Sequence, residues 1–130
     1  MINKEKYIKL VSKLNRLTKE EQIHWEESKP SIALRVGVDD VWIDFYKTFY
    51  ANTYIGIGEA RSPSYSEDLD RHYWSQRVVW ALIDYDGELE YELPNTEGLW
   101  NLLDTIRRTL SDVDSKIESL INAPDLDEDK

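Results

Sequence analysis

The segment VVWALIDYDGELEYEL, residues 78–93, decides the fold. Two apolar runs of period two flank Asp86-Gly87, a dipeptide that tolerates the positive φ angles of a two-residue type I′ turn. The turn predicts an antiparallel hairpin whose register places Leu82 opposite Tyr91. One face of this hairpin is then apolar, and the other mixes apolar side chains with glutamates. The apolar face consists of Val78, Trp80, Leu82, Leu89, Tyr91 and Leu93.

Upstream of this hairpin the apolar period is also two, which predicts further strands. Residues 31–38 (SIALRVGV) alternate with one buried face. Residues 41–50 (VWIDFYKTFY) carry aromatic side chains on both faces, which favours a central strand. Residues 53–58 (TYIGIG) contain two glycines, which predict a weakened edge or a bulge. A turn at TKEEQ is expected to lead into a short strand within IHWEES, residues 23–28.

Both ends of the chain show helical spacing. Tyr7, Ile8, Val11, Leu14 and Leu17 recur at intervals of one, three and four residues, which predicts a helix over residues 3–17 with one apolar stripe. After Pro94 the same spacing returns and continues to residue 120. Ser111 and Asp114 resemble a capping box, so we expect two helices, or one kinked helix, with the break near residue 111.

These elements predict a single α+β domain over residues 1–122. An N-terminal helix, an antiparallel sheet of five to six strands, and a C-terminal helix or helix pair packed on one sheet face make up the expected architecture. The final segment, residues 123–130 (APDLDEDK), has a proline and four acidic residues, and we expect it to be a disordered acidic tail.

Charge and composition limit the classes of function. The 130-residue chain has no cysteine and a net charge of −10. Residues 1–19 carry six basic residues and one acidic residue, a net of +5, which leaves −15 on the remainder. Such a surface disfavours nucleic acid and anionic membranes and favours a basic partner. No apolar run resembles a signal peptide or a membrane span, so we expect a cytoplasmic protein.

Motifs for catalysis and cofactor binding are weak. GIGEA, residues 56–60, has a G-x-G but lacks the third glycine and a following helical pattern, so a dinucleotide site is not predicted. His24 and His72 do not have metal-ligand spacing, and no serine has a positioned base. The sequence therefore predicts no cofactor, no metal site and no catalytic residue, and an enzyme is the less favoured interpretation.

The segment GEARSPSYSEDLDRHYWSQ, residues 58–76, is the longest stretch without apolar periodicity, and we expect a long loop that crosses between two halves of the sheet. A loop of this length is a candidate interface or pocket lid. Its second half, from Ser66, also has the pattern of a capped helical turn. The candidate binding residues in the segment are Arg61, Tyr65, Arg71, His72 and Trp74.

Three functions remain open. The first is a non-enzymatic protein-binding module, of the immunity, antitoxin or inhibitor kind, that uses an acidic, aromatic-bearing sheet surface. Glu88, Glu90 and Glu92 are expected to form a row on one strand face beside Tyr85, and the chain has five tryptophans and eight tyrosines. The second is a small-ligand-binding protein or minor enzyme with its pocket beside residues 58–76. The third is a structural homodimer.

The order of elements is similar to that of a known group of proteins. A striped helix leads into LTKEEQIHWEES (residues 17–28), paired strands follow, and LWNLLDTIRRTLSDVDSKIESLI (residues 99–121) closes the chain. In this order the chain resembles small, uncharacterised bacterial and phage-associated α+β proteins. The resemblance implies a meander between two helical ends, and it implies no catalytic residues.

Overall fold

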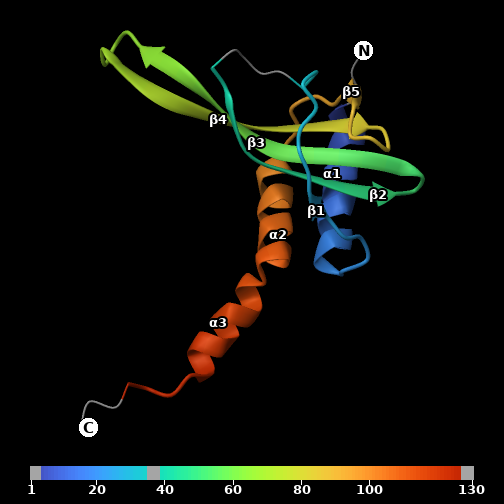
Figure 1. Cartoon of the computed structure of the whole chain (residues 1–130), viewed down its shortest axis with the longest axis vertical. Coiled ribbons are helices and arrows are strands. Elements are labelled where there is room, and N and C mark those ends of the chain that lie inside the picture. Colours follow the sequence, from blue (N-terminus) through green and yellow to red (C-terminus); the bar gives the residue numbers. More distant parts are fainter. Residues whose placement is uncertain (1–3, 35–38, 127–130) are drawn as a thin grey trace.

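The computed structural model describes residues 4–34 and 39–126. It shows an α+β fold with an N-terminal helix, a five-stranded antiparallel sheet and two C-terminal helices (Figure 1), which confirms the predicted class. No helix among the described residues is long and apolar enough to cross a membrane. In chain order the elements are α1 (Lys4–Lys19), β1 (Glu26–Glu27), β2 (Val41–Tyr50), β3 (Thr53–Ser66), β4 (Arg71–Ile83), β5 (Leu89–Glu92), α2 (Leu99–Ser111) and α3 (Val113–Asn122).

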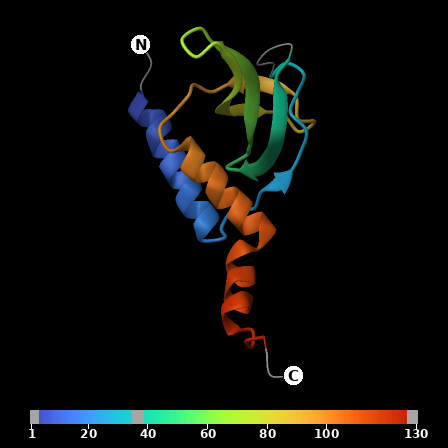
Figure 2. The ribbon, with the colours of Figure 1, turned by 90° about the vertical axis from the view of Figure 1, so that its left-hand side faces the viewer.

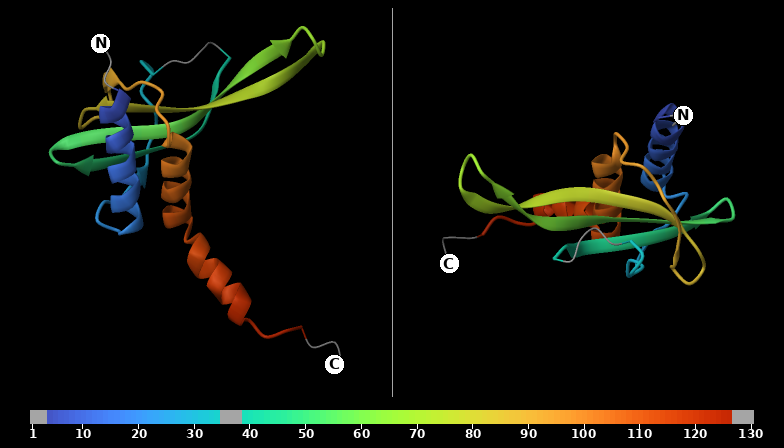
Figure 3. Two further views of the ribbon diagram at one scale, coloured as in Figure 1. Left: turned by 180° about the vertical axis from the view of Figure 1, so that it is seen from behind. Right: turned by 90° about the horizontal axis from the view of Figure 1, so that it is seen from above.

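The sheet is a meander in which each strand pairs with the next, in the order β1-β2-β3-β4-β5. β3 and β4 pair without interruption from Tyr54 opposite Ile83 to Ser66 opposite Arg71, and they form the longest ladder. β1 and β5 are short, so they cover only parts of the outer edges of β2 and β4. The two views in Figure 3 show one end of the β3–β4 ladder projecting beyond the rest of the sheet.

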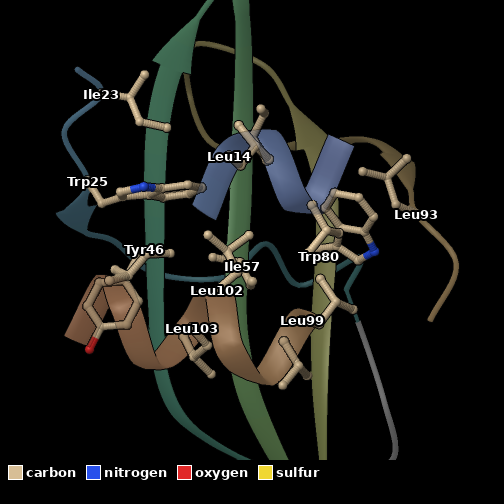
Figure 4. Packing of buried hydrophobic residues seen from close by; sticks show 14 of the residues in the cluster. Leu14, Ile23, Trp25, Tyr46, Ile57, Trp80, Leu93, Leu99, Leu102 and Leu103 are labelled. Atoms are coloured by element: carbon tan, nitrogen blue, oxygen red, sulfur yellow. The ribbon is translucent and has the colours of Figure 1, made fainter. Parts of the chain in front are cut away.

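The main core lies between one face of the sheet and the helices α1 and α2, and this face is called the helix side below. Strand residues of period two meet the stripes of both helices there, as the sequence predicts. The indole of Trp80 is fully buried and its Nε1 donates a hydrogen bond to the carbonyl of Pro94. Figure 4 shows the centre of this core, in which Leu14, Ile23, Trp25, Tyr46, Ile57, Trp80, Leu93, Leu99, Leu102 and Leu103 are labelled.

A smaller apolar cluster lies on the opposite face of the sheet, with Phe45 and Leu34 buried in it. The predicted edge at Gly56 and Gly58 is wrong, because β3 is the central strand. Neither glycine lies in a bulge, since both pair in regular register with β2, and the irregularity of this ladder lies in β2 between Trp42 and Asp44. The Phe45 ring lies against both glycines, and a Cβ on Gly58 would lie 2.2 Å from the backbone oxygen of Asp44. These glycines therefore make room for an aromatic ring of the neighbouring strand.

The decisive hairpin forms, but its turn differs from the prediction. Asp84 N donates to the carbonyl of Glu88, and Gly87 N donates to the carbonyl of Asp84, so the loop has three residues and Gly87 has a φ of 85°. Leu82 does pair with Tyr91, as predicted. A bulge then follows, Leu89 pairs with Ile83, and Leu89 packs on the smaller cluster instead of joining the helix side.

The strand predicted over residues 31–38 is not formed in its described part, since residues 31–34 form a turn and a bend and residues 35–38 lie outside the described residues. The strand predicted within residues 23–28 is reduced to β1, while Ile23 and Trp25 are buried as expected. The sheet has five strands in consequence.

The C-terminal helical segment breaks at Asp112, which has a φ of 56° and lies between α2 and α3. The predicted break near residue 111 is confirmed, but its predicted cause is wrong. Ser111 Oγ donates to the carbonyl of Arg107, and α3 has no side-chain cap. Helix α2 packs on the sheet, whereas α3 has no buried residue and projects from the body (Figure 2). Residues 127–130 of the predicted tail lie outside the described residues.

Candidate functional site

The segment predicted as a long loop, residues 58–76, is instead the far end of β3, a turn at residues 67–70, and the beginning of β4. β2 begins at Val41, which pairs with Arg61, so beyond Arg61 the strands β3 and β4 continue as an isolated ladder. We call residues 61–76 the arm. The arm projects from the upper part of the molecule in Figure 1, on the same side as α3.

The helix side of the sheet continues along the arm. Directly paired residues share a face, and Ile57 with Trp80 lies on the helix side, so every second pair beyond them also does. Helix α2 covers this face only as far as the pair of Glu59 and Val78. The uncovered residues on the same face are Arg61 with Gln76, Pro63 with Trp74, and Tyr65 with His72.

This uncovered face combines aromatic rings with basic groups. Trp74 is 56% exposed and Tyr65 is 49% exposed, although both are large enough to serve as core residues. The Tyr65 and His72 rings have centroids 5.1 Å apart. We call Arg61, Tyr65, His72 and Trp74 the arm face. Four of the five residues predicted from this segment are therefore brought together on it, while Arg71 lies on the reverse side.

The reverse side of the arm is lined mainly by hydroxyl groups. Ser64 Oγ donates to Ser75 Oγ, and Ser75 Oγ donates to the carbonyl of Ser62. At the tip, the backbone N–H of Leu69 donates to Ser66 Oγ, which confirms a turn with Ser66 at its beginning, but no helix forms. The Tyr65 hydroxyl donates to Asp70 across this turn.

An ion cluster lies at the base of the arm, where α2 meets the sheet. Arg107 on α2 donates to both carboxylate oxygens of Asp44, at 2.7 and 3.0 Å, and to Glu59 at 2.7 Å. Arg61, the first residue of the arm, donates to the other oxygen of Glu59 at 2.8 Å. The Tyr46 hydroxyl completes the cluster with a bond to Asp44. Two carboxylates and two guanidinium groups thus balance in charge.

The surroundings keep both carboxylates ionised. Burial raises the pKa of Asp44, but hydrogen bonds from Arg107, the backbone N–H of Glu59 and Tyr46 outweigh it and leave this pKa below its ordinary value. Burial also opposes ionisation of Glu59, and its bonds to Arg107 and Arg61 likewise lower its pKa. Burial and the neighbouring Asp44 raise the pKa of Tyr46.

The chemistry of this cluster favours anchoring over catalysis. A general acid at neutral pH needs a carboxyl pKa that is raised toward 7, and both carboxyl pKa values here are lowered. Every oxygen of the two carboxylates is hydrogen-bonded. Within the described ranges, no group of three or more histidine, aspartate and glutamate side chains could hold a metal ion. The cluster fixes α2 and the root of the arm to the same two strands.

The predicted glutamate row lies far from the arm. Tyr91 opposes Leu82 on β4, roughly 25 Å along the strand from Trp74 at about 3.3 Å per residue. The bulge at Glu90 interrupts the alternation of the row, and Glu88 accepts a hydrogen bond from Ser31 Oγ at 3.0 Å. The glutamate row and the aromatic residues of the arm therefore do not form one continuous surface.

Tyr85 lies at this distant end of the sheet as well. Its ring meets the Tyr54 ring edge-on, with centroids 5.9 Å apart, and the Tyr54 ring contacts Phe49 at 4.5 Å. His24 is exposed. Two surface depressions of about 440 and 530 Å³ are lined by residues at positions 5–21 and 105–115, and neither includes a residue of the arm.

No family model, curated protein or solved structure matches this chain. Sequence reasoning missed the ion cluster, because its members lie 48 and 63 positions apart in the chain. A signal was present: Asp44 and Glu59 each interrupt an apolar strand, and a carboxylate inside a buried strand requires a partner.

Proposed function

We propose that this protein is a non-enzymatic protein-binding module, of the immunity, antitoxin or inhibitor kind, and that the arm face contacts its partner. The observation that carries the proposal is the change along one ladder face. Up to Glu59 and Val78 this face is covered by α2, and beyond them the same face presents Trp74 and Tyr65 to solvent.

Physical chemistry supports a contact surface here. An isolated two-stranded ladder is marginally stable in water, because it buries little apolar area. Exposed tryptophan and tyrosine are enriched in the centres of protein interfaces, where burying one such ring contributes about 2 kcal/mol or more. The ion cluster holds the root of the arm, so the rings on it are presented on a fixed support.

Affinity capture with the purified chain tests the proposal. The wild type, at low and at high salt, is compared with Tyr65→Ala/Trp74→Ala, which strips the arm face. Tyr73→Ala is the matched control, because Tyr73 is also half-exposed on the arm but lies on its reverse side. Thermal unfolding confirms that all three chains are folded.

The proposal predicts that a partner identified with wild type is lost with the double variant and kept with Tyr73→Ala. Capture that is equal for all three chains contradicts the arm face as the contact. A fourth chain, Glu88→Gln/Glu90→Gln/Glu92→Gln, tests the acidic strand. If this glutamine variant fails to capture the partner at low salt while the other three chains capture it there, binding is assigned to the glutamates. That result would overturn the assignment to the arm.

A further inference from the structure

Among the described residues, no strand lies beside the outer edge of β4 in the arm. β5 pairs only with residues 81–83, and Leu93 N donates to the carbonyl of Trp80. Since backbone groups of a strand alternate between its two neighbours, Trp80 fixes which residues face outward. These residues are His72, Trp74, Gln76 and Val78. Among the described residues, none donates to or accepts from their outward backbone groups.

The opposite edge of the arm is protected, and this one is not. β3, the opposite edge of the arm, contains Pro63, which lacks an N–H and blocks strand pairing. The outer strands β1 and β5 have two and four residues. β4 has no proline and no lysine from residue 71 to residue 79, and its ladder with β3 is free of bulges. A straight, unprotected edge of this length is a template for an added strand.

Two arginines beside this edge favour one kind of strand. The ladder residues 61–66 and 71–77 contain three arginines and no acidic residue, while the turn between them, residues 67–70, contains three acidic residues. Arg71 and Arg77 flank the free edge, six residues apart on the same side of the strand. Arg71 forms no ion pair with another described residue, whereas Arg77 has a 3.8 Å contact with Asp40.

A second copy of the chain would meet like charges on this edge in the register centred on Trp74. Two β4 strands pairing antiparallel about Trp74 would place Arg71 of each copy opposite Arg77 of the other, and like charges in opposed positions are destabilising. An acidic strand pairs favourably, because two carboxylates six residues apart would lie opposite the two guanidinium groups. The side chains of Trp74 and His72 then line one face of the added strand.

We infer that the free edge of β4, from His72 to Val78, binds an extended acidic segment of a partner protein by strand addition. This inference rests on the proposed binding function and gives it a mode and a partner chemistry. Backbone hydrogen bonds to the outward groups supply affinity, and Arg71 and Arg77 select carboxylates and so set the register. The arm face supplies the apolar contact.

A synthetic peptide tests the inference directly. The probe is acetyl-Glu-Val-Thr-Val-Thr-Val-Glu-amide, whose two carboxylates are six residues apart, and binding is followed by NMR chemical shifts of the arm amides. A lysine-ended peptide of the same core is the charge control. Two further peptides are N-methylated at the second, fourth and sixth or at the third and fifth residues, so that each loses the amide hydrogens of one edge only.

We expect saturable shifts at residues 72–78, at least tenfold weaker binding of the lysine peptide, and loss of binding with one methylation pattern but not with the other. Gln76→Pro removes an outward N–H and should abolish binding, while Gln76→Ala should retain it. Both chains are checked for folding by their amide spectra, and the peptide comparisons stand even if the proline variant unfolds.

Absence of binding overturns the inference, as does equal loss with both methylation patterns, equal binding of the lysine peptide, or self-association through residues 72–78. None of these results by itself contradicts the proposed binding function. A partner captured through Tyr65 and Trp74, together with an edge that binds no strand, would mean that the arm contacts its partner by side chains alone.

Discussion

Replacing Arg107 with methionine should destabilise the fold more than a substitution on the surface of a helix usually does. Methionine keeps the length and the apolar stem but removes three hydrogen bonds to Asp44 and Glu59. Removing one partner of a buried ion pair costs about 3–5 kcal/mol. The Arg107 side chain is 31% exposed and that of Glu59 is 4% exposed, so we expect a loss of about 2–4 kcal/mol in the free energy of unfolding.

Two further variants isolate the cause of this loss. Arg108→Met is the matched control, because Arg108 follows on the same helix and pairs with Asp114, which is 81% exposed. An exposed pair of this kind contributes at most about 1 kcal/mol. Asp44 has its ion pair with Arg107, whereas Glu59 also pairs with Arg61. Combining Arg107→Met with Asp44→Asn removes the orphaned carboxylate, so the double variant should be more stable than the sum of the single effects predicts, by about 1 kcal/mol or more.

The pH dependence gives the change an electrostatic signature. In the wild type the pKa values of Asp44 and Glu59 are lowered from 3.8 and 4.5, so their contribution is present above those values and is lost as the pH falls through the native ones. Without Arg107, the hydrogen bonds from this side chain that lower both pKa values are absent while the burial remains, so both pKa values rise from their wild-type level. As the pH falls, protonation of these two carboxylates removes the unpaired charge and reduces the destabilisation of the variant.

Urea unfolding at about pH 7 and about pH 4 measures both effects. The difference in unfolding free energy between wild type and Arg107→Met should be largest at the higher pH and should narrow at the lower pH. A loss no greater than that of Arg108→Met, or a difference that widens toward acid, would refute the assignment of the cluster as an ionic anchor.

Three other changes have defined outcomes. Thr18→Val removes the acceptor of the buried Trp25 indole N–H and should cost about 1–3 kcal/mol in urea unfolding, whereas Thr109→Val, which loses only an exposed bond to a carbonyl, should cost under about 0.5 kcal/mol. Gly58→Ala places a Cβ against the Asp44 backbone and should lower the free energy of unfolding by about 2 kcal/mol or more. Gly87→Asn, which keeps a residue tolerant of positive φ, should change it by no more than about 1 kcal/mol. Similar losses for the two variants would contradict the close approach of Phe45 and Asp44 to Gly58. Removing residues 113–130 should leave the free energy of unfolding within about 0.5 kcal/mol of the intact chain, because α3 buries no residue, and a larger loss would show that α3 packs on the body.

The sequence predicts those parts of the fold that are buried. Residues 78–83 are apolar throughout because both faces of this part of β4 are buried, and the stripes of α1 and α2 repeat at threes and fours because one side of each helix packs in the main core. Turn geometry is less well determined: Asp-Gly suits both a two-residue turn and the three-residue loop that forms, and the choice moves Leu89 to the opposite face.

The arm could not be predicted from hydrophobic periodicity, because neither of its faces is buried. In residues 61–66 the size of the side chain alternates, but the hydropathy does not. Small serines occupy positions 62, 64 and 66, and the larger Arg61, Pro63 and Tyr65 lie between them. Four of the candidate residues in this segment were nevertheless identified, since exposed aromatic and basic side chains stand out in any conformation. Their common face depends on the register with β4, which is a property of the ladder.

Photocrosslinking at two neighbouring positions tests the central claim most directly. A benzoylphenylalanine is placed at Trp74, on the arm face, or at Tyr73, on the reverse side, and the chain is irradiated in the cells that produce it. The account predicts a specific crosslinked protein from position 74 and little or none from position 73. Crosslinking only from position 73, or from neither position while the chain is folded and present in the cells, would contradict it.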